Sequence, residues 1–185
     1  MKIRKTVIIL VIIIILLIGG IFVFNKINNK KEIEELEIIP QEEISEEQLR
    51  QTIVTLYYKN VDTKELMPEA RKIDVNILAK TPYETLINML LEEPKNEKME
   101  RTIPNGTILN KAELKGNVLY IDFSKEFIDN HQGTKQEEEK TINSIVNTVT
   151  ELTEIEFIKI IIDGEENKGF NDGGIVFNEQ FSKIR

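Results

Sequence analysis

The sequence contains no cysteine and a single histidine among its 185 residues. Without cysteine, the chain cannot build a disulfide framework or a cysteine-ligated metal site, and it has no cysteine to carry a lipid. The histidine, His131, lies in a polar stretch with no serine or cysteine nucleophile motif near it. These absences favour a surface histidine over a catalytic one and make a hydrolase a distant alternative.

Acidic residues are absent from the first 31 positions, which hold six of the 24 basic residues. From Glu32 onward, 18 basic residues stand against 32 acidic ones, which gives this part of the chain a net charge of −14. A surface of this sign repels phosphate backbones and anionic lipid headgroups. We therefore expect a soluble, acidic folded region and no nucleic-acid partner.

An uninterrupted apolar run extends from Val7 to Phe24. As a helix, its eighteen residues span roughly 27 Å, close to the thickness of a bilayer's hydrocarbon core. Basic residues flank both ends, so the positive-inside rule alone leaves the orientation open. A cleaved signal peptide is the alternative, but its apolar region is usually shorter, and no A-x-A-like site follows. We expect an uncleaved single-pass anchor in the cell membrane.

The segment after the apolar run reads as an acidic tether. Eight glutamates lie between Glu32 and Glu47, interleaved with apolar residues, and Pro40 interrupts any continuous helix. A solvated spacer is favoured over an acidic docking segment. The expected organisation is a cytoplasmic N-terminus at residues 1–6, a transmembrane anchor at 7–24, the tether at 25–50 and an extracytoplasmic domain at 51–185.

Thr134 to Gly164 contains the strongest signals of regular structure. Thr134 and Glu137 have capping-box spacing, so a helix is expected to begin near Lys135. Apolar residues recur at helical spacing, and the pattern then changes to a buried strand that ends at Asp163-Gly164. The apolar stripe comprises Ile142, Ile145, Val146, Val149 and Leu152, and the positions expected to face elsewhere are Glu138, Lys140, Asn147 and Glu151.

The preceding part of the chain predicts a second helix and several strands. Thr81, Pro82 and Glu84 mark a helix start, and Pro94 ends that helix. Glu92 to Arg101 is expected to be a charged loop. Alternating or β-branched residues predict strands at 52–58, 66–77, 107–114, 118–123 and, at the C-terminal edge, 175–177.

The order of these elements defines the expected fold class. The strands at 107–114 and 118–123 are separated by a compact turn and form a β-hairpin. Two helices, each apolar on one face, must cover the same side of a sheet. We therefore expect an α+β fold, a two-layer α/β sandwich with one mixed sheet and two helices on one face, ferredoxin-like in its order.

Four segments occur in a characteristic order between about Thr52 and Phe181: LYYKNVDTKELMPEARKI, IPNGTIL, NVLYIDFSKEF and IVNTVTEL followed by an apolar strand and DG. This set resembles the GerMN domain family. The resemblance implies an extracytoplasmic domain associated with envelope-spanning assemblies of sporulation and spore germination, related to ring-building motifs. Some members are lipoproteins, a pattern from which this chain departs because it has no cysteine to acylate.

Two residue pairs match motifs of the resembled family. Glu69 and Arg71 correspond to its Pro-Glu-x-Arg pattern and, two apart on a strand, share a face, so a structural salt bridge is favoured over a partner-binding pair. Asn147 and Thr148 correspond to its Asn-Thr pair. On a helical wheel Asn147 lies about 150° from the centre of the apolar stripe. A contact outside the domain is therefore expected for Asn147.

Two further groups have both a chemical and a structural interpretation. Asp122 with Ser124 could take part in acid–base chemistry, but a strand-end residue and a helix N-cap explain them equally well. An oxygen-rich group near the C-terminus might bind calcium, but its spacing fits no EF-hand, and turn chemistry is favoured. That group comprises Asp163, Glu165, Glu166, Asn171 and Asp172.

The functional hypothesis is a non-enzymatic, membrane-anchored, extracytoplasmic interaction module similar to GerM-type proteins, with no cofactor. Its expected partners are the membrane and envelope or sporulation-complex proteins, and the acidic surface predicts weak self-association. The alternative is an envelope domain that binds a ligand, either a cell-wall glycan or a metal at a surface loop.

Overall fold

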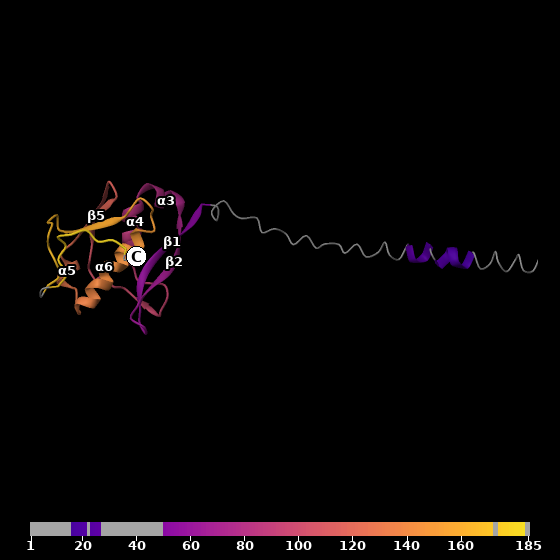
Figure 1. Ribbon diagram of the computed structural model, residues 1–185, viewed down its shortest axis with the longest axis horizontal. Helices are drawn as coiled ribbons and strands as arrows, with labels where there is room; N and C mark the ends of the chain where they lie inside the picture. Colours follow the sequence, from indigo (N-terminus) through magenta and orange to yellow (C-terminus); the bar gives the residue numbers. More distant parts are fainter. Residues whose placement is uncertain (1–15, 22, 27–49, 172–173, 184–185) are drawn as a thin grey trace, which may run out of the picture. The chain divides into compact units, whose positions relative to one another are not determined.

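The computed structural model describes residues 16–21, 23–26, 50–171 and 174–183 (Figure 1). The chain divides into two units, Met1–Ile44 and Ser45–Arg185. In the first unit, residues 16–21 and 23–26 are helical. No helix within the described ranges has the length and apolar character needed to cross a bilayer. The rest of the run from Val7 to Phe24 and residues 27–49 of the tether lie outside the described residues, so the anchor remains a prediction.

The first sheet of the folded unit is built around strand β1 (Gln51–Asn60). It pairs antiparallel with β2 (Leu66–Asp74) along its length and with the short β3 (Met99–Glu100) at its end, which gives the order β2-β1-β3. Alternate residues of β1 face the core, whereas Ile53 on the other face is 65% exposed. The buried apolar residues of β1 are Val54, Leu56 and Tyr58.

The second sheet has the order β4-β5-β6 and is mixed. Strands β4 (Leu109–Lys115) and β5 (Val118–Phe123) form the predicted hairpin, which turns at Gly116 with a φ of 66°. Strand β6 (Phe157–Ile162) runs parallel to β5, and its connection contains the short helix α5 (Glu126–Asp129) and the long helix α6 (Lys135–Val149). This is the crossover that a parallel pair requires.

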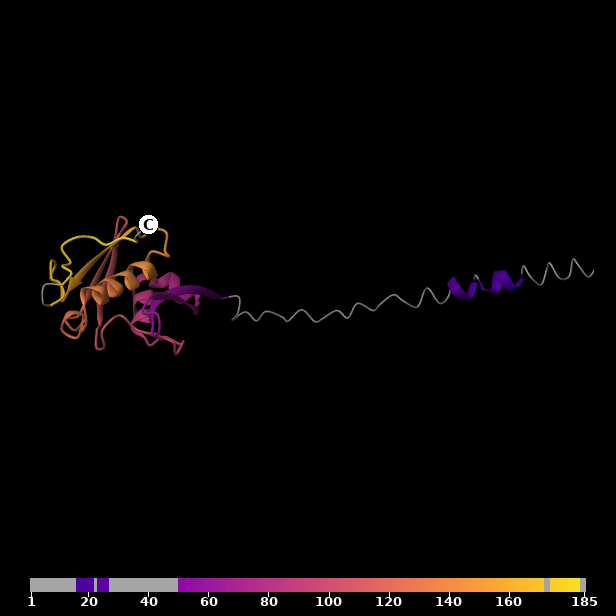
Figure 2. The ribbon, with the colours of Figure 1, turned by 60° about the horizontal axis from the view of Figure 1, so that its bottom comes forward.

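Helices α3 (Val75–Lys80) and α4 (Pro82–Leu91) lie between β2 and β3 in the chain. In Figure 2, α6 lies between β6 and the purple strands of the first sheet. The predicted stripe of α6 is buried at Ile142, Ile145, Val146 and Val149, and Leu152 packs against the same core. The two sheets and α4 and α6 thus share one continuous apolar core.

The prediction of one sheet was wrong, because the described strands form two three-stranded sheets. The physical reason is that helix α6 makes hydrogen bonds to the edge of β1 that faces away from β2. At Tyr57 the backbone groups that point away from β2 bond to α6: the Tyr57 N–H donates to Thr148 Oγ1 (3.1 Å), and Ser144 Oγ donates to the Tyr57 carbonyl (2.5 Å). Because helix hydroxyls satisfy this edge, no strand of the second sheet pairs with it.

Several local predictions were also wrong. Residues 75–77 begin α3 instead of extending β2, because Asp74 Oδ1 accepts from the Asn76 N–H (2.7 Å) and caps a helix there. The segment Glu92 to Arg101, predicted to be a charged loop throughout, contains the short strand β3. Residues 175–177 make an isolated bridge at Val176, not a strand. Thr134 makes no capping bond, because its hydroxyl donates to Gln136 Oε1 (2.9 Å).

Candidate functional site

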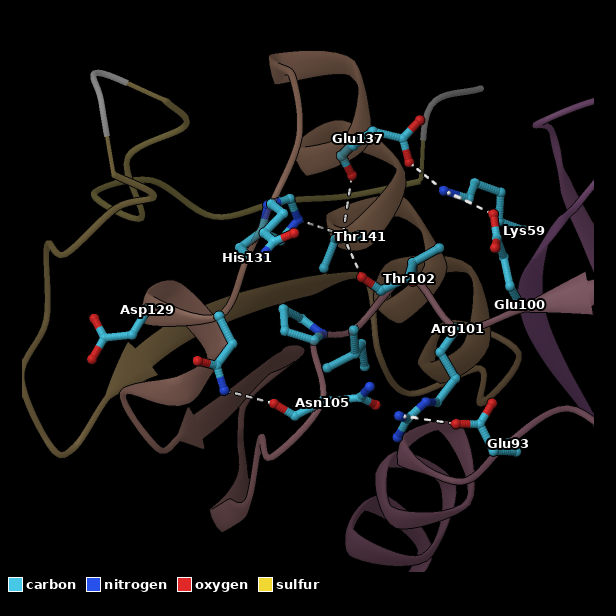
Figure 3. A pocket seen from close by; sticks show the side chains of 14 residues that line it. Lys59, Glu93, Glu100, Arg101, Thr102, Asn105, Asp129, His131, Glu137 and Thr141 are labelled. Carbon is cyan, nitrogen blue, oxygen red and sulfur yellow. Dashed lines mark hydrogen bonds and ion pairs between the residues drawn. The ribbon is translucent and has the colours of Figure 1, made fainter.

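A polar hollow of about 560 Å³ lies beside the first turns of α6 (Figure 3). Two loops, residues 93–105 and 129–132, form its other walls. Its lining residues include Lys59, Glu93, Glu100, Arg101, Thr102, Asn105, Asn130, His131, Glu137 and Thr141.

His131 is half-buried in this hollow, so its expected place on the open surface was wrong. Its Nε2 lies 3.0 Å from Thr141 Oγ1, and its ring centroid lies 4.3 Å from that of Phe170. Thr141 Oγ1 also lies within donating distance of two backbone carbonyls, those of Thr102 (2.9 Å) and Glu137 (3.0 Å). When the hydroxyl donates to either carbonyl, its oxygen can accept from an Nε2–H of His131.

Burial lowers the pKa of His131, and this outweighs the opposing influence of the Glu138 and Glu137 carboxylates. The ring is therefore neutral at pH 7, with one nitrogen as an acceptor. Sequence reasoning missed this environment because Phe170 lies far along the chain from His131.

Charged residues of the hollow are engaged with one another. Lys59 Nζ lies 3.1 Å from Glu100 Oε1 and 2.5 Å from Glu137 Oε2, and Lys140 reaches Glu137 at 3.1 Å. Burial lowers the pKa of Lys59, but hydrogen bonds to Glu137 and Glu100 outweigh it, so the pKa is raised. The hydrogen bond from Lys59 lowers the pKa of Glu137. Both groups stay ionised at neutral pH.

The remaining wall is held by backbone contacts. Arg101 Nη1 donates to the Leu91 carbonyl (2.7 Å), and its Nη2 lies 3.0 Å from Glu93 Oε1. Asn130 Nδ2 donates to the Asn105 carbonyl (2.7 Å). Among the described residues, Thr102 Oγ1 is the one buried side-chain oxygen or nitrogen without a hydrogen-bond partner. The hollow therefore offers polar contacts, and four of its charged residues, Lys59, Glu137, Arg101 and Glu93, are held in ion pairs.

Glu69 and Arg71 form a buried pair, 9% and 4% exposed. Arg71 Nε donates to Glu69 Oε1, and Arg71 Nη2 donates to the Glu93 carbonyl (2.9 Å). Glu69 accepts from the backbone N–H groups of Lys95 (3.2 Å) and Asn96 (2.9 Å). Burial raises the pKa of Glu69, but the bonds from Asn96, Arg71 and Lys95 outweigh it and lower the pKa. The pair fixes the loop that carries Glu93 into the hollow.

The neighbouring residues Asn147 and Thr148 have different surroundings. Thr148 is fully buried and accepts from the Tyr57 N–H, as described above. Asn147 is half-buried, and within residues 50–171 and 174–183 its side chain makes no hydrogen bond. Sequence reasoning missed Ser144, although a hydroxyl four residues before Thr148 and beside the apolar stripe was a readable signal of a backbone partner.

Residues of the oxygen-rich group near the C-terminus make hydrogen bonds and an ion pair with other residues of the domain. Asp163 Oδ1 accepts from Asn110 Nδ2 (3.3 Å), Glu165 pairs with Lys168 (2.7 Å), and Asn171 Nδ2 donates to the Ile128 carbonyl (3.4 Å). Asp172 lies outside the described residues. In the described part of the chain, no group of three or more His, Cys, Asp or Glu residues is placed to hold a metal ion.

Asp122 and Ser124 also make structural contacts. Asp122 Oδ1 accepts from the Gly164 N–H (3.1 Å), which fixes the turn after β6. Ser124 Oγ accepts from the Ile108 N–H (3.0 Å). The two side chains thus bond to different loops, so the geometry joins neither of them to His131.

The fold and motifs place the chain in a known family. Residues 55–168 match the family described as "Germane: Sporulation and spore germination". This match covers more than half of the 185 residues, so the chain belongs to the Germane, or GerMN, family. No curated protein matches the chain.

Solved structures agree on the fold. The tandem GerMN domains of the sporulation protein GerM from Bacillus subtilis are 21% identical with a TM-score of 0.60, and the match covers 74% of this chain and 47% of that one. The first GerMN domain of the same protein is 20% identical, with a TM-score of 0.59 and coverage of 71% and 98%. A putative lipoprotein from Clostridium perfringens is 21% identical, with a TM-score of 0.51 and coverage of 76% and 93%. The chain therefore spans about half of the tandem-domain protein.

Proposed function

We propose that this chain is a non-enzymatic, membrane-anchored interaction module that acts outside the cytoplasm in a sporulation or spore-germination assembly. The observation that carries the proposal is the family match over residues 55–168, because the description of that family names sporulation and spore germination. The apolar run from Val7 to Phe24 supports the anchor.

The geometry of the polar hollow supports a role without catalysis. A general base or nucleophile must be free to exchange a proton with a substrate. Here Glu137 is held by Lys59 and Lys140, and the Thr141 hydroxyl lies within hydrogen-bond distance of two backbone carbonyls. These groups stabilise the walls of the hollow and the start of α6.

The surface of α6 supports a protein contact. Thr148 accepts from β1, whereas the adjacent half-buried Asn147 makes no side-chain hydrogen bond within the described residues and can bond to a partner. A half-buried amide on a rigid helix is preorganised, so little conformational entropy is lost when a partner binds there.

Complementation tests the proposal. A strain that lacks the gene is expected to lose normal spore formation or germination, and the full chain is expected to restore it. Asn147→Lys should fail to restore the phenotype at wild-type protein level, whereas the matched surface change Asn110→Lys should restore it. His131→Gln, which keeps a donor toward Thr141, should also restore it.

Two results would contradict the proposal. Full rescue by Asn147→Lys would place the partner contact elsewhere. Loss of rescue by a folded His131→Gln protein would favour chemistry at His131.

A further inference from the structure

A second hollow, of about 550 Å³, lies on the outer face of the β4-β5-β6 sheet, away from the hollow around His131. In register, Tyr120 of β5 lies beside Lys159 of β6, and Phe157 shares the face of Lys159 because the two are two residues apart. The core residues Ile121 and Ile160 alternate with them and point to the opposite face. The far side of the hollow is formed by the C-terminal segment, residues 178–180.

Lys159 is unusual because it is a lysine that is 7% exposed. Its Nζ donates to the Asn178 carbonyl (2.7 Å), and among the described residues no carboxylate lies within 4.0 Å of it. An ammonium group has three hydrogens to donate, so two remain for other acceptors in the hollow. A buried cation with so few partners is costly, which indicates a role beyond holding the C-terminal segment.

The nearest candidate counter-ion in the same row of the sheet is already used. Glu113 pairs with Tyr120 across the hairpin, and Lys111 (2.9 Å) and Lys115 (3.4 Å) both contact its carboxylate. Lys115 Nζ also lies 4.8 Å from the Tyr120 ring centroid. Tyr120 thus separates Lys159 from this group of charges.

The lining of the hollow selects among ligand classes. Glu166 and Glu179 also line it, so together with Lys159 the charged groups sum to a negative value, which disfavours an anion. A neutral polyol can instead accept from Lys159 and donate to the carboxylates, while an apolar sugar face packs against the aromatic side chains. Asn178 and Gln180 line the same hollow and add further polar groups.

We propose that this hollow binds a neutral sugar unit of a glycan, with Lys159 donating to ligand oxygens and Tyr120 and Phe157 packing against the ring. This site is separate from the Asn147 surface, so glycan binding and partner binding can fail independently.

Calorimetric titration of the full chain with tetra-N-acetylchitotetraose tests the proposal. We expect saturable binding that is weakened at least tenfold in Lys159→Met, which keeps the length of the side chain and removes the donor. Lys168→Met is the matched control, because Lys168 is exposed and pairs with Glu165 outside the hollow, and its affinity should equal that of the wild type. Tetragalacturonate, an anionic sugar of equal length, should bind more weakly than the neutral probe.

Amide chemical-shift mapping on the wild-type chain keeps the test independent of how the variants fold. Binding of the neutral probe should shift the amides of Tyr120, Lys159 and Gln180. The proposal is overturned by an absence of binding at millimolar probe, by tighter binding of the anionic probe, by equal affinity of a folded Lys159→Met protein, or by shifts confined to residues around His131.

Discussion

Arg71 and Glu69 bring two opposite charges into the interior of the domain, and each depends on the other. Glu69 also accepts from two backbone N–H groups of the 92–96 loop, and Arg71 donates to a carbonyl of the same loop. A carboxylate and a guanidinium removed from water are tolerated because these contacts replace hydration. The pair therefore ties this loop to strand β2.

We predict that Arg71→Met destabilises the domain by roughly 3–5 kcal/mol, because it leaves the Glu69 charge buried without its partner. The double variant Glu69→Leu/Arg71→Met should be less destabilised than this single variant, because it removes both charges. Urea unfolding of the full chain measures both, and the exposed neighbour Lys72→Met is the control. An additive double variant would show that the two side chains act independently.

His131 should make stability depend on pH. Because its pKa in the folded state lies below the ordinary value of 6.5, the unfolded chain takes up the proton first as the pH falls. The stabilising contribution is thus complete above pH 6.5 and is lost as the pH falls through that value. His131→Gln should lose less stability than the wild type between pH 7.5 and 5.5 in urea unfolding. A steeper loss in the variant would mean that the folded state binds the proton more tightly.

Helix α6 connects the two sheets by presenting two kinds of buried side chain. Its apolar stripe packs into the shared core, while Ser144 and Thr148 bond to the Tyr57 backbone at the edge of β1. The helix therefore satisfies backbone groups of Tyr57 that a neighbouring strand would otherwise satisfy.

Replacement of Thr148 by valine should cost about 1–3 kcal/mol, because it keeps the shape but leaves the buried Tyr57 N–H unpaired. Thr150→Val is the matched control, since the Thr150 hydroxyl bonds to the Val146 carbonyl within its own helix and should matter little. Thermal unfolding of both variants compares them. Equal shifts in melting temperature would mean that the contact with β1 contributes nothing beyond helix propensity.

Local periodicity was enough to predict the helices at 82–91 and 135–149, the hairpin and strand β6. Their apolar residues repeat at a fixed spacing that a single core face explains. The separation into two sheets could not be predicted in this way, because it depends on two hydroxyls of α6 meeting β1 across about 90 residues. Strand β3 was missed because its two residues lie inside a charged loop and pair with the distant Lys59 and Asn60.

The candidate site was predicted less fully than the fold. The spacing of Glu69 and Arg71 indicated that they share a face, but the loop they hold was not readable from sequence. The hollow around His131 joins segments that are separate in sequence, so no local motif marks it.

At the scale of the whole molecule, charge opposes self-association. From Ser45 onward, 18 basic residues stand against 26 acidic ones, which gives a net charge of −8, and like-charged surfaces resist close approach at low salt. We predict that a fragment starting at Ser45, the first residue of the folded unit, is monomeric at micromolar concentration in low salt. Sedimentation equilibrium at low and high salt measures this, and a stable dimer or ring at low salt would show that the domain assembles by itself.

We propose that the folded unit lies outside the cytoplasm, held by a membrane anchor. Because the chain has no cysteine, one introduced cysteine is a unique label. Lys72→Cys, on the exposed side of β2, and Lys2→Cys, before the apolar run, should be treated with a membrane-impermeant maleimide in intact protoplasts. We predict labelling of Lys72→Cys in intact protoplasts and of Lys2→Cys after lysis alone, whereas a Lys72→Cys protein that reacts only after lysis would contradict the claim.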